Sequence, residues 1–304
     1  MVASDTRRHL RGREAWNEVK ILVTGRNGQV VRSLLERGVG RDIVALGRPD
    51  LDLNVQGSAR DAILGLRPDI VINAAAYTNV DAAEDETERA MRINGEAAGE
   101  VAAAAREVGA PVIQISTDYV FDGSAKGPYT EDAPTNPIGA YGGSKLLGEQ
   151  RVRDFNPNHA IVRTAWVYSP FGRNFVKTMM TLAQTRDTLS VVADQHGNPT
   201  SALDLADGLL ALVDAGIAGG ETYHLAGTGD ATWFELAEHI FAQCARLGMP
   251  WATVTPVITA DYPTKATRPA NSRLDSTRFT AATGFVMPGW RASVDETIAR
   301  LAAV

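Results

Sequence analysis

The chain has one cysteine, Cys244, so it cannot form an internal disulfide. A lone cysteine is typical of proteins from reducing compartments, and we expect a cytoplasmic location. In the segment WFELAEHIFAQCARLG, the cysteine shares one helical stripe with apolar side chains. This spacing indicates a small buried side chain and argues against a catalytic thiol.

Signals for membranes, metals and nucleic acids are also missing. No apolar run approaches the roughly 20 residues that span a bilayer, and the five histidines show no metal-ligand spacing. Residues 1–18 are basic but have no apolar stretch of the kind found in signal peptides. We predict that they form a flexible extension; a nucleic-acid-binding arm is the alternative, which the net charge of −6 does not favour. We therefore expect no metal, no membrane and no nucleic-acid partner.

From residue 19 onward the sequence alternates regularly between strand and helix patterns. The short apolar runs VKILVTG, DIVALG, DIVINAAA, APVIQISTD and HAIVRTAWVY are separated by segments with helical period. Nearly continuous apolar strands that alternate with helices are typical of a parallel sheet buried on both faces. We predict an α/β fold: a Rossmann-type, doubly wound parallel sheet with a smaller, mostly helical C-terminal cap.

The pattern changes near residue 168, where helical segments joined by short strands and Pro/Gly-rich links begin. We predict a dinucleotide-binding domain at 19–168 and a substrate-binding cap formed mainly by 169–304. Because GETYHLAG has a strand pattern, we also expect the chain to return to the first domain around 201–230.

The segment VTGRNGQVV, residues 23–31, lies where a dinucleotide-binding turn is expected, between the first strand and the first helix. Gly25 and Gly28 occupy the positions of the first two glycines, which permit the tight turn and the close approach of a pyrophosphate to the helix N-terminus. Val31 stands where a third glycine is usual. Because that glycine mainly serves helix–strand packing, we expect Val31 to shift the packing more than it blocks phosphate binding.

The end of the second strand usually has an acidic residue that holds the adenosine ribose. Here the sequence has Gly47 followed by Arg48. Without the acid, and with a guanidinium beside it, the site would tolerate a 2′-phosphate, so we predict that NADPH is accepted, alone or alongside NADH. A solvated surface charge is the alternative interpretation of Arg48. Asp52 lies a few residues on, within reach of the adenine or ribose.

The segment YGGSK places Tyr141 and Lys145 four residues apart, on one face of a helix. A nearby ammonium favours a phenolate, so we expect Lys145 to lower the pKa of Tyr141 and suit it for proton transfer. Upstream, Ser116, Thr117 and Asp118 end a strand at the edge where open α/β sheets bind ligands. We expect Thr117 to hydrogen-bond a substrate oxygen; a role in capping the turn is the alternative.

Six segments in this order match one family. They are TGRNGQV, NAAAYTNVDAAE, STDYVFDG, YGGSKLLGE, RTAWVY and RPANSRLD. Over residues 19–303 the chain resembles the dTDP-4-dehydrorhamnose reductases, which are extended short-chain dehydrogenases/reductases. STDYVFDG, RTAWVY and RPANSRLD are much more specific than the glycine turn alone.

The resemblance implies hydride transfer from NADPH or NADH to C4 of dTDP-4-dehydro-β-L-rhamnose, which gives dTDP-β-L-rhamnose in the last step of that sugar's biosynthesis. Tyr141 would donate the proton to the C4 oxygen and Lys145 would hold the nicotinamide ribose. Thr117 would hydrogen-bond the reacting oxygen, and Asp118 and Trp166 would line the sugar. The cap would then bind the sugar nucleotide.

The resemblance also implies binding residues for the diphosphate and the cofactor. Asn271 and Arg273 would face the nucleotide diphosphate, although Arg273 in a structural ion pair is the alternative. Relatives with a residue other than glycine at the Val31 position support our interpretation of a working glycine turn. The cofactor would contact Gly25, Asn27, Gly28, Gln29, Val30, Arg48, Asp52, Leu53, Ala74, Ala75 and Ala76, as well as Tyr141 and Lys145.

Two rival functions stay open at this point. Another nucleotide-sugar ketoreductase or epimerase of the same superfamily would share the Tyr141 and Lys145 chemistry and differ in the cap. A regulatory subunit without activity is a rival from another class, which the complete set of Thr117, Tyr141 and Lys145 disfavours. A homodimer and a monomer are both compatible with the sequence. Some relatives dimerise through magnesium-linked acidic residues, but the start of QVVRSLLE has Arg32 and Ser33 where an early acid would be needed, so we do not expect that metal site.

Overall fold

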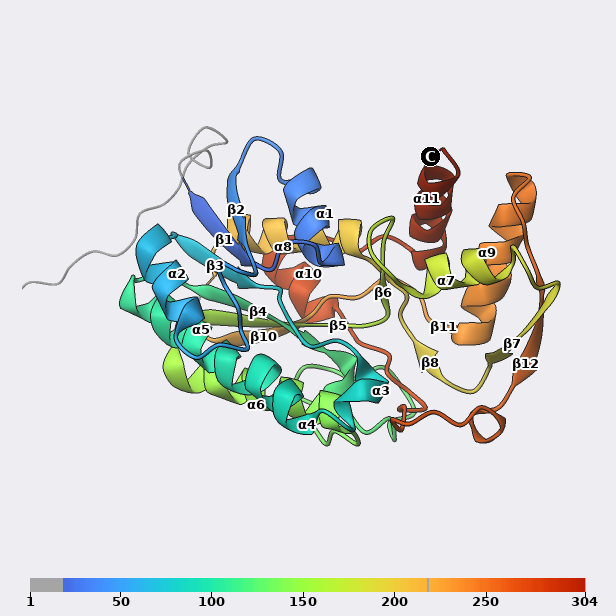
Figure 1. Cartoon of the computed structure of the whole chain (residues 1–304), viewed down its shortest axis with the longest axis horizontal. Helices are drawn as coiled ribbons and strands as arrows, with labels where there is room; N and C mark the ends of the chain where they lie inside the picture. The colour runs from blue at the N-terminus through green and yellow to red at the C-terminus, as the bar shows by residue number, and fades with distance from the viewer. Residues whose placement is uncertain (1–18, 218, 304) are drawn as a thin grey trace, which may run out of the picture.

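A six-stranded parallel sheet forms the centre of the larger part of the molecule (Figure 1). The computed structural model describes residues 19–217 and 219–303, so the predicted extension at 1–18 lies outside the described residues. Every pairing in the sheet is parallel, as predicted from the apolar strand runs. In spatial order the strands are β10 (Glu221–His224), β5 (His159–Thr164), β4 (Val112–Thr117), β3 (Ile70–Asn73), β1 (Lys20–Thr24) and β2 (Asp42–Leu46).

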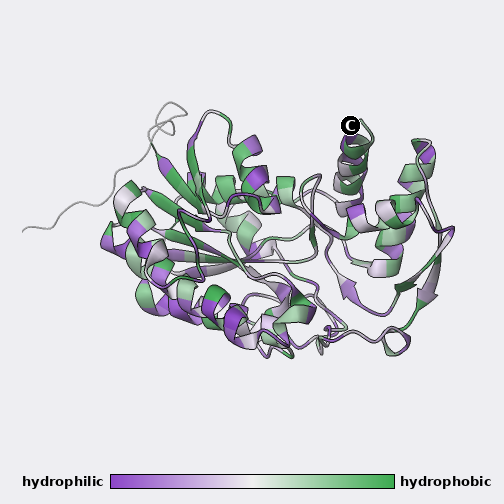
Figure 2. Cartoon of the chain, viewed as in Figure 1, coloured by the Kyte–Doolittle hydropathy of each residue, from purple (hydrophilic) through white to green (hydrophobic). Residues whose placement is uncertain are grey.

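Helices cover both faces of this sheet, so the doubly wound α/β prediction is confirmed (Figure 1). In Figure 2 the apolar strands lie between helices whose outer faces are polar. One face packs against α1 (Gln29–Arg37), α8 (Ala202–Ala215) and α10 (Thr277–Thr283), and the other against α2 (Ser58–Leu66), α5 (Ala97–Glu107) and α6 (Ala140–Phe155).

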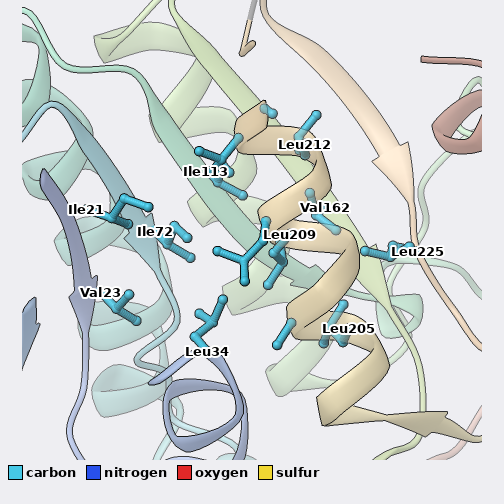
Figure 3. Packing of buried hydrophobic residues seen from close by; sticks show 14 of the residues in the cluster. Ile21, Val23, Leu34, Ile72, Ile113, Val162, Leu205, Leu209, Leu212 and Leu225 are labelled. Atoms are coloured by element: carbon cyan, nitrogen blue, oxygen red, sulfur yellow. The ribbon is translucent and has the colours of Figure 1, made fainter. Parts of the chain in front are cut away.

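Helix α8 packs closely on the sheet through its leucines. Leu209 points toward Ile72 of the sheet (Figure 3), and Leu205, Leu209, Leu212, Ile72 and Ile113 are buried in one apolar cluster. Fully burying a leucine or isoleucine contributes about 1.5–3 kcal/mol each. This packing places residues 202–215 and strand β10 with the large sheet, although they follow residue 168 in sequence. The division of the chain into two domains stays a prediction.

The remaining C-terminal residues form helices and small sheets, in agreement with the helical segments and short strands predicted there. This region has its own apolar core, in which Cys244 is buried as expected. Its strands pair as β6 (Val167–Tyr168) with β9 (Thr200–Ser201), β7 (Thr188–Val192) with β12 (Thr253–Val257), and β8 (His196–Gly197) with β11 (Ala231–Thr232). Its helices are α7 (Phe175–Leu182), α9 (Trp233–Arg246) and α11 (Trp290–Ala302), with a 3-10 turn at Thr259–Asp261.

The helical region between β3 and β4 is divided into different helical types. After α3 (Val80–Ala83) and α4 (Thr87–Ala90), the chain forms a π-helical segment, Met91–Glu96, before α5 begins. Single π-turns are frequent at functional sites, and this one packs on α6. In the described part of the chain, no helix has the length and apolarity to cross a membrane.

Candidate active site at the carboxyl edge of the sheet

The glycine turn has the geometry of a phosphate-binding turn. Gly25 has φ +103°, and a Cβ added there would lie 3.1 Å from Val31 Cγ2. Val31 is buried in the core beneath the turn, so its side chain does not occupy the space in front of α1. No side chain caps the start of α1 at Gly28, and its first turn has no acidic residue. The helix N-terminus is therefore suited to an anion.

The other residues predicted in this turn have different surroundings. Asn27 is exposed, whereas Val30 packs partly buried against the core. The Gln29 side chain is engaged by the protein: its Oε1 accepts hydrogen bonds from Ser169 Oγ at 2.8 Å and Asn174 Nδ2 at 2.9 Å. Gln29 thus ties residues 169–174 to the start of α1, beside the predicted pyrophosphate site.

The end of β2 leaves little room for the missing ribose acid. A Cβ added at Gly47 would lie 3.0 Å from the Arg26 backbone nitrogen and 3.1 Å from the Gly25 carbonyl carbon. A side chain at this position would push the glycine turn away, which is a physical reason for the glycine. Arg48 is exposed beside it, and Arg26 pairs with Asp50. Arg26 adds a second guanidinium here, and the sequence analysis missed it.

Asp52 and Leu53 are placed less favourably for a cofactor than predicted. The Asp52 carboxylate accepts a hydrogen bond from the Asn54 backbone nitrogen at 3.0 Å. The Leu53 side chain is 5% exposed and packs in the core on the α2 and α5 face. Any contact from Leu53 to a cofactor would therefore come from its backbone.

The three alanines after β3 lie next to the glycine turn. The Ala75 nitrogen donates to Thr24 Oγ1 at 3.0 Å, and its Cβ lies 3.6 Å from a Cβ added at Gly25. Ala74, Ala75 and Ala76 are all half-buried. The fold therefore brings the carboxyl ends of β1 and β3 together, and cofactor contact by the three alanines stays a prediction.

Tyr141 and Lys145 lie on the first two turns of α6, facing the end of β4. Lys145 is 4% exposed, and its Nζ donates to the Ile115 carbonyl at 2.7 Å. Tyr141 is half-buried, with its ring edge-to-face on Tyr119 at a centroid distance of 5.7 Å. Thr117 Oγ1 donates to Asp118 Oδ1 at 2.8 Å and accepts from the Tyr119 nitrogen at 3.2 Å. Thr117 thus caps the turn, the alternative considered above, and also lies at the site.

The expected lowering of the Tyr141 pKa by Lys145 is wrong for this structure. Burial and the Asp118 carboxylate raise the pKa of Tyr141 to about 12, against a small lowering by hydrogen bonding with Thr117. Lys145 directs its ammonium at a backbone carbonyl, and its own pKa falls to about 8 because burial disfavours the charged form. At neutral pH the site therefore presents a protonated phenol beside a mostly charged ammonium.

Asp118 is a buried acid of the site with a raised pKa. It is 2% exposed, and burial raises its pKa to about 6, although the hydrogen bond from Thr117 and the nearby Ser272 hydroxyl act to lower it. Its Oδ2 has no hydrogen-bond partner in the described part of the chain. A buried acceptor without a donor is costly, so this oxygen is available to a ligand hydroxyl.

We expect Asp118→Asn to stabilise the protein at pH 8. The carboxyl of Asp118 has a pKa near 4 in the unfolded chain and about 6 in the folded one. The folded state is therefore destabilised as pH rises from 4 to 6, because it must then hold a buried charge. The cost reaches up to about 3 kcal/mol above pH 6. Thermal unfolding at pH 5 and pH 8 tests this: the gain in Tm should be larger at pH 8, while turnover falls. Equal gains at both pH values would contradict a charge effect.

Trp166 is held in a strained backbone conformation directly after β5. Its φ is +47°, rare for a bulky residue. The indole stacks on Trp233 with centroids 3.5 Å apart and lies against Gly197, where an added Cβ would collide with it. One ring face is therefore already covered by protein. A substrate contact of Trp166 stays a prediction.

Asn271 and Arg273 are engaged with the protein rather than free. Asn271 Nδ2 donates to the carbonyls of Ala125 and Gly127, both at 2.8 Å. Arg273 donates to Asn271 Oδ1 at 2.8 Å, to the Lys126 carbonyl at 2.7 Å and to Asp230 at 3.3 Å. These contacts match the structural alternative for Arg273. Diphosphate binding by these two residues would require some of the bonds to exchange, and it stays a prediction.

The sequence analysis also missed the polar residues that hold α6. Asn94, in the π-helical segment, donates to the Tyr77 carbonyl at 3.0 Å and to Ser144 Oγ at 2.9 Å. Ser144 in turn donates to the Tyr141 carbonyl at 2.7 Å. The π-turn thus links the segment after β3 to the helix that bears Tyr141. The sequence signal for this contact was the asparagine in MRINGEAAG, a residue of low helix propensity within a helical pattern.

Comparisons with known proteins support this arrangement. Residues 19–303 match the family described as "RmlD substrate binding domain". The chain is 41% identical to the dTDP-4-dehydrorhamnose reductase of Sinorhizobium fredii, over 90% of this chain and 95% of that protein. The chain belongs to the dTDP-4-dehydrorhamnose reductase family. The resemblance seen in the six motifs is thereby confirmed.

Solved structures of this family agree with the fold. A dTDP-4-dehydrorhamnose reductase from Clostridium acetobutylicum superposes with a TM-score of 0.87 at 41% identity, covering 93% of this chain and 99% of that one. The Bacillus anthracis reductase, in complex with NADP, has a TM-score of 0.86 at 38% identity with the same coverage. The family's reaction is the final step of dTDP-L-rhamnose biosynthesis, and its members are oxidoreductases.

Proposed function

We propose that the chain reduces the C4 ketone of dTDP-4-dehydro-β-L-rhamnose with NADPH or NADH, in the cytoplasm. Family membership supports the reaction, and the site supports its chemistry. The single most informative observation is the group of Thr117, Asp118, Tyr141 and Lys145 at the carboxyl edge of β4, where an α/β sheet binds ligands. The lone buried cysteine agrees with a reducing compartment.

The residues present fit a nicotinamide dinucleotide. The uncapped start of α1 suits the pyrophosphate, and neither Gly25 nor Gly47 places a Cβ against the closely packed backbone of the turn. Arg48, with Arg26 near it, suits a 2′-phosphate, and Lys145 would hold the nicotinamide ribose. When bound, the dinucleotide would supply the hydride for the ketone.

The protein's own part in the reaction is proton donation and orientation. The Tyr141 phenol, protonated at neutral pH because its pKa is about 12, would donate its proton to the C4 oxygen as that oxygen gains negative charge. The Thr117 hydroxyl would donate a hydrogen bond to the same oxygen, releasing Asp118 Oδ1. Asp118 Oδ2, which lacks a partner, would accept a hydrogen bond from a sugar hydroxyl.

A turnover assay tests the function. Purified protein with dTDP-4-dehydro-L-rhamnose should oxidise a reduced nicotinamide cofactor and form dTDP-L-rhamnose. A folded protein that binds nucleotide sugars without turnover would indicate a different ketosugar or a regulatory role. Tightly bound NAD that persists through purification, with no net oxidation, would indicate an epimerase.

We expect NADPH to be the better cofactor and Arg48→Ala to reduce that preference. Loss of the exposed guanidinium should raise KM for NADPH about 10- to 30-fold, the effect of about 1.5–2 kcal/mol at the low end of the range for a hydrogen bond to a charged group, and leave KM for NADH nearly unchanged. Arg67→Ala is a matched control, because Arg67 is also an exposed arginine but lies at the C-terminal end of α2 rather than at the end of β2. Equal changes for both cofactors in Arg48→Ala would favour the surface-charge interpretation.

A further inference from the structure

Glu149 is a buried carboxylate one helical turn beyond Lys145 on α6. Its side chain is 0% exposed. Ser116 donates to Oε1 at 2.6 Å, and Arg163 donates to Oε1 and Oε2, both at 2.8 Å. Bidentate arginine–carboxylate pairs are strong and directional. The neighbouring strands β4 and β5 thus fix this carboxylate against the catalytic helix.

Lys145 is a buried ammonium that needs a counter-charge. Its only hydrogen bond among the described residues is the one to the Ile115 carbonyl, a neutral acceptor. Burial of an ammonium strongly disfavours its charged form. Glu149 is the one charged group in the described chain that acts on the Lys145 pKa, and it opposes the lowering by burial. Ile115 and Ser116 are adjacent on β4, so one strand end orients both the lysine and its counter-ion.

The charged groups around Glu149 keep it ionised. Burial alone would raise its pKa, but hydrogen bonds from Arg163 and Ser116 and the nearby Arg153 hold it below its ordinary value. Arg153, on α6, donates to Oε2 at 3.1 Å. His224, on β10, lies 3.4 Å from Arg163 and stays neutral, because burial lowers its pKa to about 3.

Other charges near α6 are paired elsewhere or act on other groups. From the π-helical segment, Arg92 pairs with Glu100 of α5 at 2.7 Å, and Glu96 pairs with Arg151 of α6 at 3.1 Å. Asp118, beyond β4, acts on Tyr141. Glu149 is therefore the carboxylate that acts on the Lys145 pKa, and Arg163 and Arg153, which are bonded to it, moderate its field.

We propose that Glu149 is a positioning residue for the reduction: fixed by Ser116 and Arg163, its carboxylate keeps Lys145 protonated and directed at the Ile115 carbonyl, ready to bind the nicotinamide ribose. The inference rests on the role proposed above for Lys145. It gives a functional reason for a buried ion pair, which by itself is weak evidence for stability.

The test is the pH dependence of kcat/KM for Glu149→Gln, with NADPH and the 4-keto sugar. In the wild-type chain the rate should fall as Lys145 loses its proton near pH 8. In Glu149→Gln the same fall should begin about one pH unit lower, with much smaller differences between the two proteins at pH 6. A merely structural role would lower the rate at every pH and leave the fall where it is. A folded Glu149→Gln protein with an unshifted profile would overturn the proposal.

Two further variants complete the experiment. Glu96→Gln makes the same chemical change in an exposed ion pair to α6 and should leave the profile unshifted.

If Glu149→Gln does not fold, Glu149→Met/Arg163→Met replaces the buried pair with apolar side chains, a change that proteins often tolerate. Because this variant removes a cation together with the carboxylate, we expect a smaller shift in the same direction, and a fall at the wild-type pH or above it would overturn the proposal. Should the wild-type chain show no turnover, the proposed reaction fails, and the pH dependence of NADPH binding, followed by fluorescence, then gives the same comparison for Glu149.

Discussion

Tyr141→Phe should reduce kcat by about 10²–10⁴-fold, the usual contribution of a positioned general acid, and leave NADPH binding little changed. Phenylalanine fills nearly the same space, so the edge-to-face contact with Tyr119 is kept. What is lost is the only phenol that α6 presents at the end of β4. Tyr119→Phe is the matched control, since it removes a hydroxyl from the adjacent ring. Single-turnover kinetics at saturating cofactor would separate this loss from changes in binding.

The raised pKa of Tyr141 sets a further condition on this result. A phenol with a pKa of about 12 is protonated throughout the physiological range. The reduction should therefore show no loss of rate from Tyr141 itself below about pH 10, and the oxidation direction, which needs the phenolate, should be slow at neutral pH and accelerate as pH rises. Equal losses in Tyr141→Phe and Tyr119→Phe would place the proton donor elsewhere.

The sequence was sufficient for the sheet because its strands are nearly continuous apolar runs. A parallel sheet buried on both faces requires such runs, and β1, β3 and β4 lie within the runs VKILVTG, DIVINAAA and APVIQISTD. The glycine turn could also be predicted, because TGRNG lies between a strand and a helix. In the structure Gly25 has a positive φ, and Gly47 packs against the backbone of Gly25 and Arg26. These features depend on local sequence.

The less accurate predictions concern interactions between segments far apart in the chain. The spacing of Tyr141 and Lys145 placed them on one helix face, but it did not show that the ammonium turns to the Ile115 carbonyl. The pKa expected for Tyr141 was wrong for that reason, and because the Asp118 carboxylate and burial act in the opposite direction. Likewise, nothing in RPANSRLD indicated that Arg273 would be held by the carbonyl of Lys126.

The packing of α6 against the π-helical segment shows how much depends on one such distant contact. Gly148 faces the Asn94 carbonyl so closely that an added Cβ would collide with its oxygen, and it would lie 3.4 Å from Ala98 Cβ. The obstacle is the backbone of Asn94, so it cannot be relieved by the movement of a flexible side chain. The same surface includes the 2.9 Å hydrogen bond from Asn94 to Ser144.

We therefore expect Gly148→Ala to destabilise the protein by about 1–3 kcal/mol or more, as overpacking does, which lowers Tm by roughly 2–4 °C per kcal/mol. We also expect kcat to fall in the protein that remains folded, because α6 must shift away from Asn94 and takes Tyr141 and Lys145 with it.

Gly65→Ala is the matched control: Gly65 also lies within a helix, α2, but nothing lies within 4 Å of its added Cβ. That variant should gain about 0.5–1 kcal/mol from helix propensity. Thermal unfolding and kcat of both variants decide the matter. A Gly148→Ala protein as stable and active as Gly65→Ala would mean that the π-helical segment yields to α6, and that the position of the catalytic helix is set by its contacts with β4 and β5 instead.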